Sequence, residues 1–288
     1  MKKLILYALC LALGGSAAAQ ETKLRIIAIG AHPDDCDIKF AGTAAKFARA
    51  GHQVKFLSVT NGDAGHQDMG GGILAKRRYL ETQESARRLG IAEYEVLDNH
   101  DGELTPNLEV RRQVIRSIRR WKADIVIAPR PNDYHPDHRY AGVLVQDAAY
   151  MVVVPNVTPD VEPLKDNPIF FYYQDGFQKP APFRPDVVVA LDDIWETKVN
   201  ALDAHVSQFY EWLPWVDHRL QEVPKDPGAR KKWLAGARIQ PITAEARTTL
   251  VRRYGADKAR SVKYVESFEL CEYGKRPSLE EMDKIFPK

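Results

Sequence analysis

Short apolar runs alternate with longer amphipathic stretches along the first half of the chain. Four runs rich in β-branched residues predict strands, at 24–29, 54–59, 94–97 and 124–128. Three stretches with helical periodicity lie between them, at about 37–50, 73–89 and 108–121. Gly51 and Gly90 follow the first two stretches directly, at positions where a glycine commonly ends a helix.

This alternation predicts an α/β fold. Strands that alternate with helices form right-handed βαβ units, and these units build a parallel sheet. The predicted strands are continuously apolar, which is typical of strands covered on both faces. We therefore expect a Rossmann-like, doubly wound, mostly parallel sheet with helices on both faces.

The second half of the chain is less regular and is expected to form a C-terminal elaboration. Its pattern predicts a helix at about 192–208 and strands at 169–173, 187–191 and 261–270. Residues 211–240 show no clear period, and they contain three tryptophans that suit either core packing or a sugar-stacking platform: Trp212, Trp215 and Trp233. We find no repeat or linker, so residues 20–288 are expected to form one domain whose variable part begins at about 155.

The first 19 residues have the pattern of a secretory signal peptide. Lys2 and Lys3 precede the apolar stretch 4–13, and the small residues 17–19 form a cleavage site before Gln20. The apolar stretch is short for a membrane span. We therefore expect cleavage and export to the periplasm or the extracellular space, without stable membrane insertion.

Charge and cysteine content narrow the function only slightly. The 41 Lys and Arg residues include Lys2 and Lys3, so cleavage leaves 39 basic against 39 acidic residues. This neutral balance argues against a nucleic-acid partner. Cys36 and Cys271 remain, and they are consistent with one disulfide or with two separate buried thiols. The pattern does not define an oligomeric state.

Two histidine-containing motifs follow predicted strands. Ala-His-Pro-Asp-Asp at 31–35 comes directly after the first strand, and His-Pro-Asp-His at 135–138 follows the fourth. The carboxyl ends of parallel strands meet at one edge of a sheet, where open α/β folds bind their ligands. Proline also biases each preceding histidine toward extended backbone, which allows its side chain to point into the crevice.

The residue types of these motifs suit a catalytic metal. Such a site takes three ligands from His, Asp or Glu, which His32, Asp35 and His138 could supply. Asp34 would remain free as a general base and His135 as an acid or oxyanion partner. In the alternative interpretation, the aspartates only cap the following helix and the histidines are solvated loop residues.

The chain resembles the LmbE-like, or PIG-L, family of zinc-dependent de-N-acetylases. The two motifs at 31–35 and 135–138 carry the resemblance. Weaker support comes from matching residues at 60–63, 78–81, 86, 89–90, 101–102, 124–126, 198 and 205–208. The resemblance covers nearly the whole mature chain, and it implies the fold already expected from the hydrophobic pattern.

Position by position, the resemblance implies a zinc ion held by His32, Asp35 and His138. Iron or another divalent ion could occupy the same ligands, because the ligands alone do not enforce selectivity. Asp34 would be the general base that activates the attacking water and later helps to protonate the leaving amine. His135 would stabilise the oxyanion of the tetrahedral intermediate.

Three further positions take supporting roles by the same resemblance. Asp137 would orient a neighbouring imidazole, and Arg78 matches a position that family members use toward the substrate. His205 matches a recurrent position near the pocket. A helix histidine satisfied by local hydrogen bonds is an equally good interpretation of His205.

The resulting expectation is an exported, zinc-dependent hydrolase whose partner is an N-acetylated amino sugar, such as an N-acetylglucosamine-type glycan or glycoconjugate. It would release acetate and a free amino sugar. Two alternatives stay open at this point. One is an amidase that acts on a small thiol conjugate or another non-sugar amide, and the other is an inactive, metal-bearing sugar-binding protein.

Overall fold

The computed structural model of the chain describes residues 23–288. The predicted signal peptide at 1–19 lies outside these residues. Seven strands form a single sheet: β1 (Arg25–Gly30), β2 (Gln53–Thr60), β3 (Glu93–Asn99), β4 (Ile125–Ala128), β5 (Ile169–Tyr173), β6 (Val187–Ala190) and β7 (Val265–Gly274). Within residues 23–288, none of the helices combines the length and hydrophobicity that a bilayer crossing requires.

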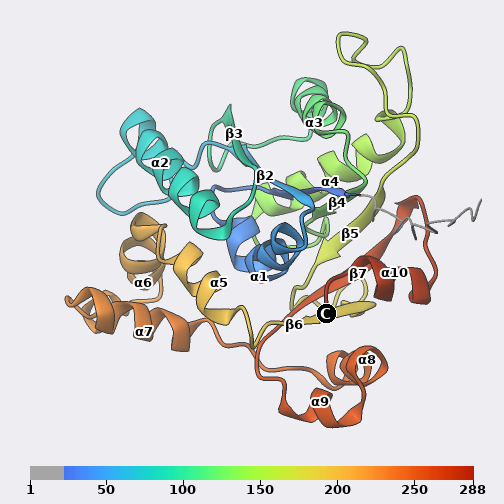
Figure 1. Cartoon of the computed structure of the whole chain (residues 1–288). Helices are drawn as coiled ribbons and strands as arrows, with labels where there is room; N and C mark the ends of the chain where they lie inside the picture. The colour runs from blue at the N-terminus through green and yellow to red at the C-terminus, as the bar shows by residue number, and fades with distance from the viewer. Residues whose placement is uncertain (1–22) are drawn as a thin grey trace, which may run out of the picture.

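Helices follow most of the strands and cover both faces of the sheet (Figure 1). The longer ones in the first half are α1 (Asp35–Arg49), α2 (Gly71–Leu89), α3 (Leu108–Trp121) and α4 (Pro136–Met151). The second half adds α5 (Trp195–Leu202), the π-helix η1 (Ser207–Trp212), α6 (Leu213–Val216), the 3₁₀-helix η2 (Leu220–Glu222), α7 (Pro227–Ala237), α8 (Ala244–Tyr254), α9 (Ala256–Ser261) and α10 (Leu279–Ile285).

The strand order is β3-β2-β1-β4-β5-β7-β6. The first five of these strands are parallel to one another, whereas β7 is antiparallel to both of its neighbours, β5 and β6. The chain winds outward from β1 to β3, then returns to the other side of β1 with β4. The expected doubly wound, mostly parallel sheet is confirmed.

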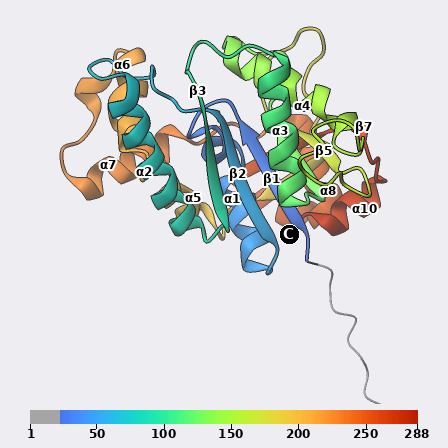
Figure 2. The same ribbon diagram turned by 90° about the horizontal axis from the view of Figure 1, so that it is seen from above.

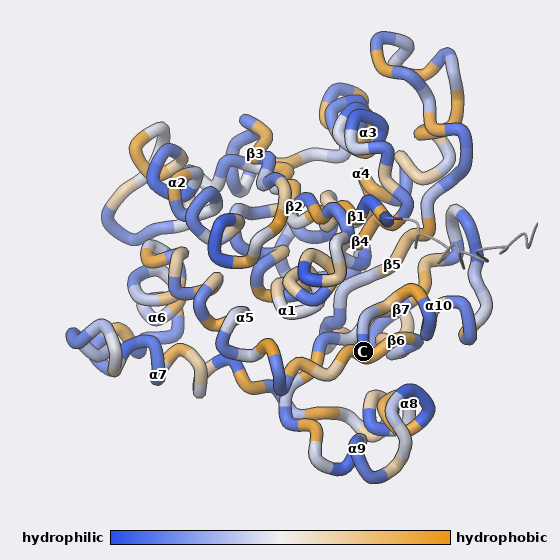
Figure 3. The backbone as a smooth tube through the Cα atoms, viewed as in Figure 1, coloured by the Kyte–Doolittle hydropathy of each residue, from blue (hydrophilic) through white to orange (hydrophobic). Residues whose placement is uncertain are grey.

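Alternate residues of each central strand enter two different cores. Helix α1 and the pair α3 and α4 lie on opposite sides of the sheet (Figure 2). Ile26 and Ala28 of β1 pack on the side covered by α1, whereas Ile27 and Ile29 pack on the side of α3 and α4. All four side chains are fully buried. Hydrophobic residues, orange in Figure 3, are accordingly concentrated in the strands between the helix layers. Burial on both faces explains why these strands are continuously apolar.

The second half of the chain departs from prediction in three places. The expected helix at 192–208 ends at Leu202, and after a turn the chain continues as the π-helix η1. The predicted half-exposed strand at 261–270 is instead β7, which begins at Val265 and lies inside the sheet. The prediction also had no counterpart for helices α4, α6, α7, α8, α9 and α10. Cys36 and Cys271 are two separate buried thiols, which was one of the two alternatives.

Candidate active site

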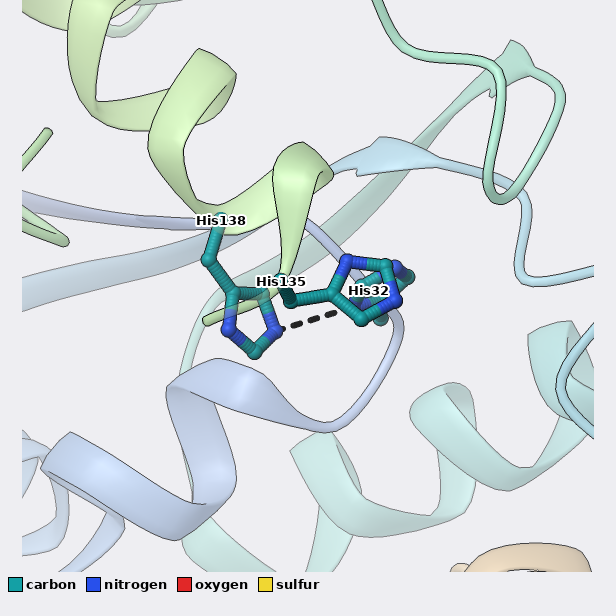
Figure 4. Close-up of side chains that lie close together, drawn as sticks. All are labelled: His32, His135 and His138. Carbon is teal, nitrogen blue, oxygen red and sulfur yellow. Dashed lines mark hydrogen bonds between the residues drawn. The ribbon is translucent and has the colours of Figure 1, made fainter. Parts of the chain in front are cut away.

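The two predicted motifs meet at the carboxyl ends of β1 and β4. These strands are neighbours at the point where the strand order reverses, and such a point opens a crevice between diverging loops. The loop after β1 carries His32, and the start of α4 carries His135 and His138. The three imidazole rings therefore converge, as Figure 4 shows.

Backbone groups of the first loop hold Asp35 in place. Its Oδ2 accepts hydrogen bonds from the N–H groups of Ala31, at 2.8 Å, and His32, at 2.9 Å. A Cβ on Gly30 would lie 2.5 Å from the Cβ of Asp35, so glycine is required at the end of β1. The other carboxylate oxygen, Oδ1, lies 3.4 Å from Nε2 of His138.

Two ring nitrogens face each other beside this carboxylate. His32 Nδ1 and His138 Nε2 lie 3.2 Å apart, the contact drawn as a dashed line in Figure 4. Asp35 Oδ2 lies 3.7 Å from His32 Nδ1. Three donor groups from two separate segments of the chain thus surround one point.

The outer nitrogen of each of these rings meets carboxylates. His138 Nδ1 lies 3.0 Å from Asp133 Oδ1. His32 Nε2 lies 3.1 Å from Asp101 Oδ1 and 3.3 Å from Asp137 Oδ2. In a neutral imidazole, a carboxylate at the outer nitrogen keeps the ring proton on that side, so that the inner nitrogen can bind a metal, as in many metal sites.

This arrangement fits a divalent metal. Two bare nitrogen lone pairs 3.2 Å apart repel each other unless a proton or a cation lies between them. With Asp35 they form the donor set of two imidazoles and one carboxylate that catalytic zinc sites use. His32, His135 and His138 also bring three ring nitrogens within 4.8 Å of one another. The predicted ligands are therefore placed together, with His135 adjacent to them.

The surrounding charges strongly favour positive charge at these nitrogens. Burial lowers the pKa of His32, but neighbouring carboxylates, first Asp101, outweigh it and raise that pKa to about 9. Burial also opposes protonation of His138, yet Asp35 and Asp133 raise its pKa to about 10. Burial alone would raise the pKa of Asp35, whereas His138 and His32 hold it well below its usual range. A metal that binds here must displace protons from the two rings.

Asp34 has a different environment from its neighbour Asp35. It occupies the N-cap position of α1, but its side chain makes no capping hydrogen bond, so helix capping does not explain it. Its Oδ1 accepts a hydrogen bond of 3.1 Å from Arg78 Nη2. Burial raises the pKa of the Asp34 carboxyl, although the charge of Arg78 opposes this.

His135 is set up to donate a hydrogen bond. Its Nδ1 accepts one of 3.2 Å from the backbone N–H of Asp137. Burial lowers the pKa of His135, and the charges of His32 and His138 lower it further. The ring is therefore neutral at neutral pH, and because Nδ1 is an acceptor its proton lies on Nε2.

The two residues expected on the substrate side take different positions. Arg78 lines the cavity, but it is only 2% exposed, and its guanidinium binds Asp34 and the carbonyl of Gly62. His205 is completely buried, with Nε2 3.2 Å from Oδ2 of Asp37, and it is not among the described residues that line the cavity. This position favours a structural role for His205 over the predicted contact with substrate.

Two carboxylates that support the histidines had no predicted role. Asp101 follows β3, and its backbone N–H donates a 3.0 Å hydrogen bond to Oδ1 of Asp63. Asp133 follows β4 and also accepts a 2.9 Å hydrogen bond from the backbone N–H of His135. The available signal was their position, because each lies in a loop after a parallel strand at the same sheet edge.

All of these loops surround an open cavity of about 300 Å³. Its wall combines the acidic and histidine side chains with residues from the first half and from the segment after α5. The members outside the motifs include Ile38, Gly65, Arg78, Tyr134, Gln208, Trp212 and Leu213. A volume of this size is at the lower end of the range for small-molecule sites.

Comparison with known proteins connects this site to an enzyme family. Residues 27–149 match the sequence profile of the PIG-L family, described as GlcNAc-PI de-N-acetylase. The chain is 34% identical over 203 residues to the diacetylchitobiose deacetylase of Thermococcus kodakarensis. That match covers 66% of this chain and 73% of the relative.

Solved structures agree with the sequence match. The N,N′-diacetylchitobiose deacetylase from Pyrococcus horikoshii, complexed with its inhibitor MPG, has a TM-score of 0.64 and 26% identity, over 85% of this chain and 83% of that one. A conserved protein from Thermus thermophilus, TT1542, has a TM-score of 0.63 and 25% identity, over 88% of this chain and 97% of that one. The chain belongs to the PIG-L family and is an enzyme that hydrolyses N-acetyl amide bonds.

Proposed function

We propose that this protein uses a zinc ion to remove the acetyl group from an N-acetylated amino sugar of the N-acetylglucosamine type, releasing acetate. The observation that carries the proposal is the pair of ring nitrogens of His32 and His138 that face each other, 3.2 Å apart beside Asp35. The sugar class is supported by the relatives, two of which are named as diacetylchitobiose deacetylases.

His32, Asp35 and His138 would hold the metal. A zinc ion in that position supplies a Lewis acid, which polarises the acetyl carbonyl and lowers the pKa of water toward neutrality. The remaining residues of the site then have to move protons and stabilise charge. Asp101, Asp133 and the other outer carboxylates fix the ring orientations that this requires.

Asp34 would carry the proton through the reaction. Its carboxylate takes a proton from the attacking water as the oxygen bonds to the acetyl carbon, and it then gives that proton to the nitrogen as the C–N bond breaks. A buried carboxyl with a raised pKa suits both transfers. Arg78 holds this carboxylate through the 3.1 Å hydrogen bond from Nη2, and so acts as a positioning residue.

His135 would stabilise the oxyanion that forms on the acetyl oxygen. A neutral ring with its proton on Nε2 donates a hydrogen bond without competing for the metal as a bare nitrogen would. Asp137 orients two of the histidines. Its backbone N–H donates a hydrogen bond to His135, and its carboxylate contacts His32. The three aspartates of the motifs thus have different tasks: Asp35 holds the metal, Asp34 carries the proton and Asp137 positions the histidines.

Acetate release tests the proposed function. The metal-free enzyme would be prepared with a chelator, and N-acetylglucosamine, N,N′-diacetylchitobiose and longer oligomers would be assayed before and after adding Zn²⁺, Fe²⁺ or Mg²⁺. We expect release only with an added transition metal, and most with Zn²⁺. Full activity in the chelated enzyme would refute the metal dependence. If the zinc-loaded enzyme released no acetate from any of the sugars, the proposed substrate class would be refuted.

Export is a separate part of the proposal and rests on the pattern of residues 1–19. We expect a mature chain that begins at or near Gln20, recovered outside the cytoplasm. Cell fractionation with N-terminal mass analysis of the native protein tests this. Recovery of an intact N-terminus in the cytoplasm would contradict it.

A further inference from the structure

Aromatic side chains lie in the wall of the catalytic cavity and directly beside it. Trp212 lines the cavity, and Trp215 stacks on it with ring centroids 5.4 Å apart and an angle of 16° between the planes. Tyr134 lines the same cavity from the loop after β4 and is 76% exposed. We refer to Trp212, Trp215 and Tyr134 as the aromatic rim.

The exposure of Trp215 is not explained by packing. It is 47% exposed, and it is the one tryptophan among the large exposed hydrophobic residues of the described chain. Trp233, from the same irregular segment, packs instead against the apolar cluster of Leu202, Phe209 and Leu234. The two alternatives for the tryptophans therefore separate, because Trp233 packs, partly buried, against a core cluster and Trp215 is left on the surface. An exposed aromatic surface beside a binding cavity is typical of a ligand contact.

The rim is held rigidly at its base. Glu211, next to Trp212 in the π-helix, accepts two hydrogen bonds from Arg77 of α2, at 2.7 and 2.6 Å, and lies 2.8 Å from His66. At the other end of the π-helix, Ser207 is bound by Glu81 of α2 through its backbone N–H and its hydroxyl. Figures 1 and 2 show α6, which continues this segment, beside α2. The tryptophan surface is thus positioned before any ligand arrives.

A glycine, Gly65, lies between the catalytic carboxylates and the aromatic rim. A Cβ on Gly65 would lie 3.0 Å from Nη1 of Arg78, 3.3 Å from Oδ2 of Asp101 and 3.6 Å from Nε1 of Trp212. Any side chain at position 65 would fill the space between these three groups. Gly65 therefore joins the cavity to the aromatic rim.

We propose that the aromatic rim binds a second pyranose ring, the one linked to the sugar that is deacetylated. This inference rests on the proposed function. Trp212 lines the cavity of about 300 Å³ and Trp215 extends the aromatic surface beyond it, so a ring linked to the reacting sugar would lie over these two side chains. A pyranose presents an apolar C–H face, which packs on an aromatic plane, and a ring of hydroxyls that stay in water. The enzyme is accordingly selective for oligosaccharides over a monosaccharide.

The ratio of two specificity constants tests this inference in the zinc-loaded enzyme. We would measure kcat/KM for N,N′-diacetylchitobiose and for N-acetylglucosamine, and compare Trp215→Ala, Trp215→Phe and Trp233→Phe with the wild type. Loss of one stacking contact should lower the disaccharide-to-monosaccharide ratio about tenfold in Trp215→Ala. Trp215→Phe should keep most of the ratio, and Trp233→Phe should keep all of it.

Each outcome bears on one proposal. An active Trp215→Ala enzyme with an unchanged ratio overturns the rim and leaves the proposed function standing. If the wild type releases acetate from neither sugar, the proposed function fails, and the rim is judged by tryptophan fluorescence during titration with N,N′-diacetylchitobiose. A spectral change that Trp215→Ala lacks would support the rim, and no change in the wild type would overturn it.

Discussion

Two regions line the same cavity: the edge of the sheet at β1 and β4, and the π-helix segment. They differ in the kind of side chain that each presents to the cavity. At the sheet edge, charged groups are buried or partly buried and are paired: His32 with Asp101, His138 with Asp133. In the π-helix segment, the polar contacts lie at the base and the surface toward the mouth is aromatic and exposed. The comparison suggests that the first region performs the chemistry and the second selects the substrate.

The two regions also differ in how they are encoded. The sheet edge is formed by two contiguous motifs, which the parallel topology brings together. Its residues are therefore placed by the fold itself. The π-helix segment uses a tertiary contact to α2, through Glu81 and Arg77, and depends on the C-terminal part of the chain. A π-helical turn is often found at functional sites, where it aims side chains that a regular helix would direct elsewhere. Here it directs Trp212 toward the cavity.

The largest effect is expected from Asp34→Asn at the sheet edge. Removing the proton carrier should lower kcat by about 10³-fold on every substrate, because no other group takes over both proton transfers. Metal content, measured by elemental analysis, should match that of the wild type. Asp35→Asn is the matched control and should lose metal instead. Full activity in Asp34→Asn would remove Asp34 as the base.

Metal retention should depend steeply on pH. His32 and His138 have pKa values raised to about 9 and about 10 in the metal-free site, so below pH 9 binding displaces up to two protons. Apparent zinc affinity should then rise with pH by up to about 100-fold per unit. Competition with a chromogenic chelator between pH 6 and 9 measures the slope. A flat profile would contradict proton displacement.

Stability of the metal-free protein should respond to pH in the opposite direction. The folded-state pKa values of both histidines lie above the usual 6.5, so protonation stabilises the fold. That contribution is fully present below pH 6.5 and is lost as pH rises through 9 to 10. Thermal melts of chelated and zinc-loaded protein over this range should therefore diverge as pH increases.

A smaller effect on zinc binding is expected from changing Asp133, whose carboxylate contacts the outer nitrogen of His138. Asp133→Ala removes the partner of His138 Nδ1 and should weaken zinc binding by about 10–100-fold. Asp133→Asn should fall between Ala and the wild type, because the amide oxygen still accepts the hydrogen bond without the charge. Asp217→Ala removes an exposed carboxylate beside the rim and is the control. Equal zinc affinity in all three variants would refute the support role.

The smallest effect is expected at the base of the rim. Glu211→Gln weakens a partly exposed ion pair with Arg77, which should cost about 1 kcal/mol and lower Tm by about 2 °C. Glu84→Gln breaks a comparable pair with Arg87 and Arg88 on α2, away from the cavity. Both should melt slightly earlier, but only Glu211→Gln should lower the preference for the disaccharide. If Glu211→Gln and Glu84→Gln showed the same preference for the disaccharide, the ion pair of Glu211 would have no role in substrate selectivity.

The features that could be predicted from the sequence are those encoded by neighbouring residues in the chain. The motifs at 31–35 and 135–138 are contiguous, and the doubly wound topology determines that they meet. Asp133 is a single acidic residue in a loop, with no periodicity to distinguish it from a solvated aspartate. Asp101 belongs to the family-like pair at 101–102, but the pattern did not show which group it contacts. His205 resembles a family position, but whether it reaches the cavity depends on burial against Asp37, which no local pattern reports.

The predicted strand at 261–270 shows how a buried charge misleads pattern analysis. Glu266 makes the segment look half-exposed, yet it is only 4% exposed, and it binds Lys198 at 2.7 Å and the backbone N–H groups of Gly42 and Thr43. The polar residue therefore faces a helix layer rather than water. Likewise, the π-helix could not be predicted because it has no α-helical period and is held by contacts to α2.

The position of β7 has a consequence for how the molecule is made. Ladder contacts join Phe171 of β5 to Leu270 and Val187 of β6 to Phe268, so β6 reaches the sheet only through a strand that is synthesised about 80 residues later. While the chain emerges from the ribosome, β5 presents an unpaired edge and β6 has no strand to join. Late, long-range pairing of this kind slows folding and exposes a growing chain to association with others. Folding of the second half therefore has to wait until β7 has been made.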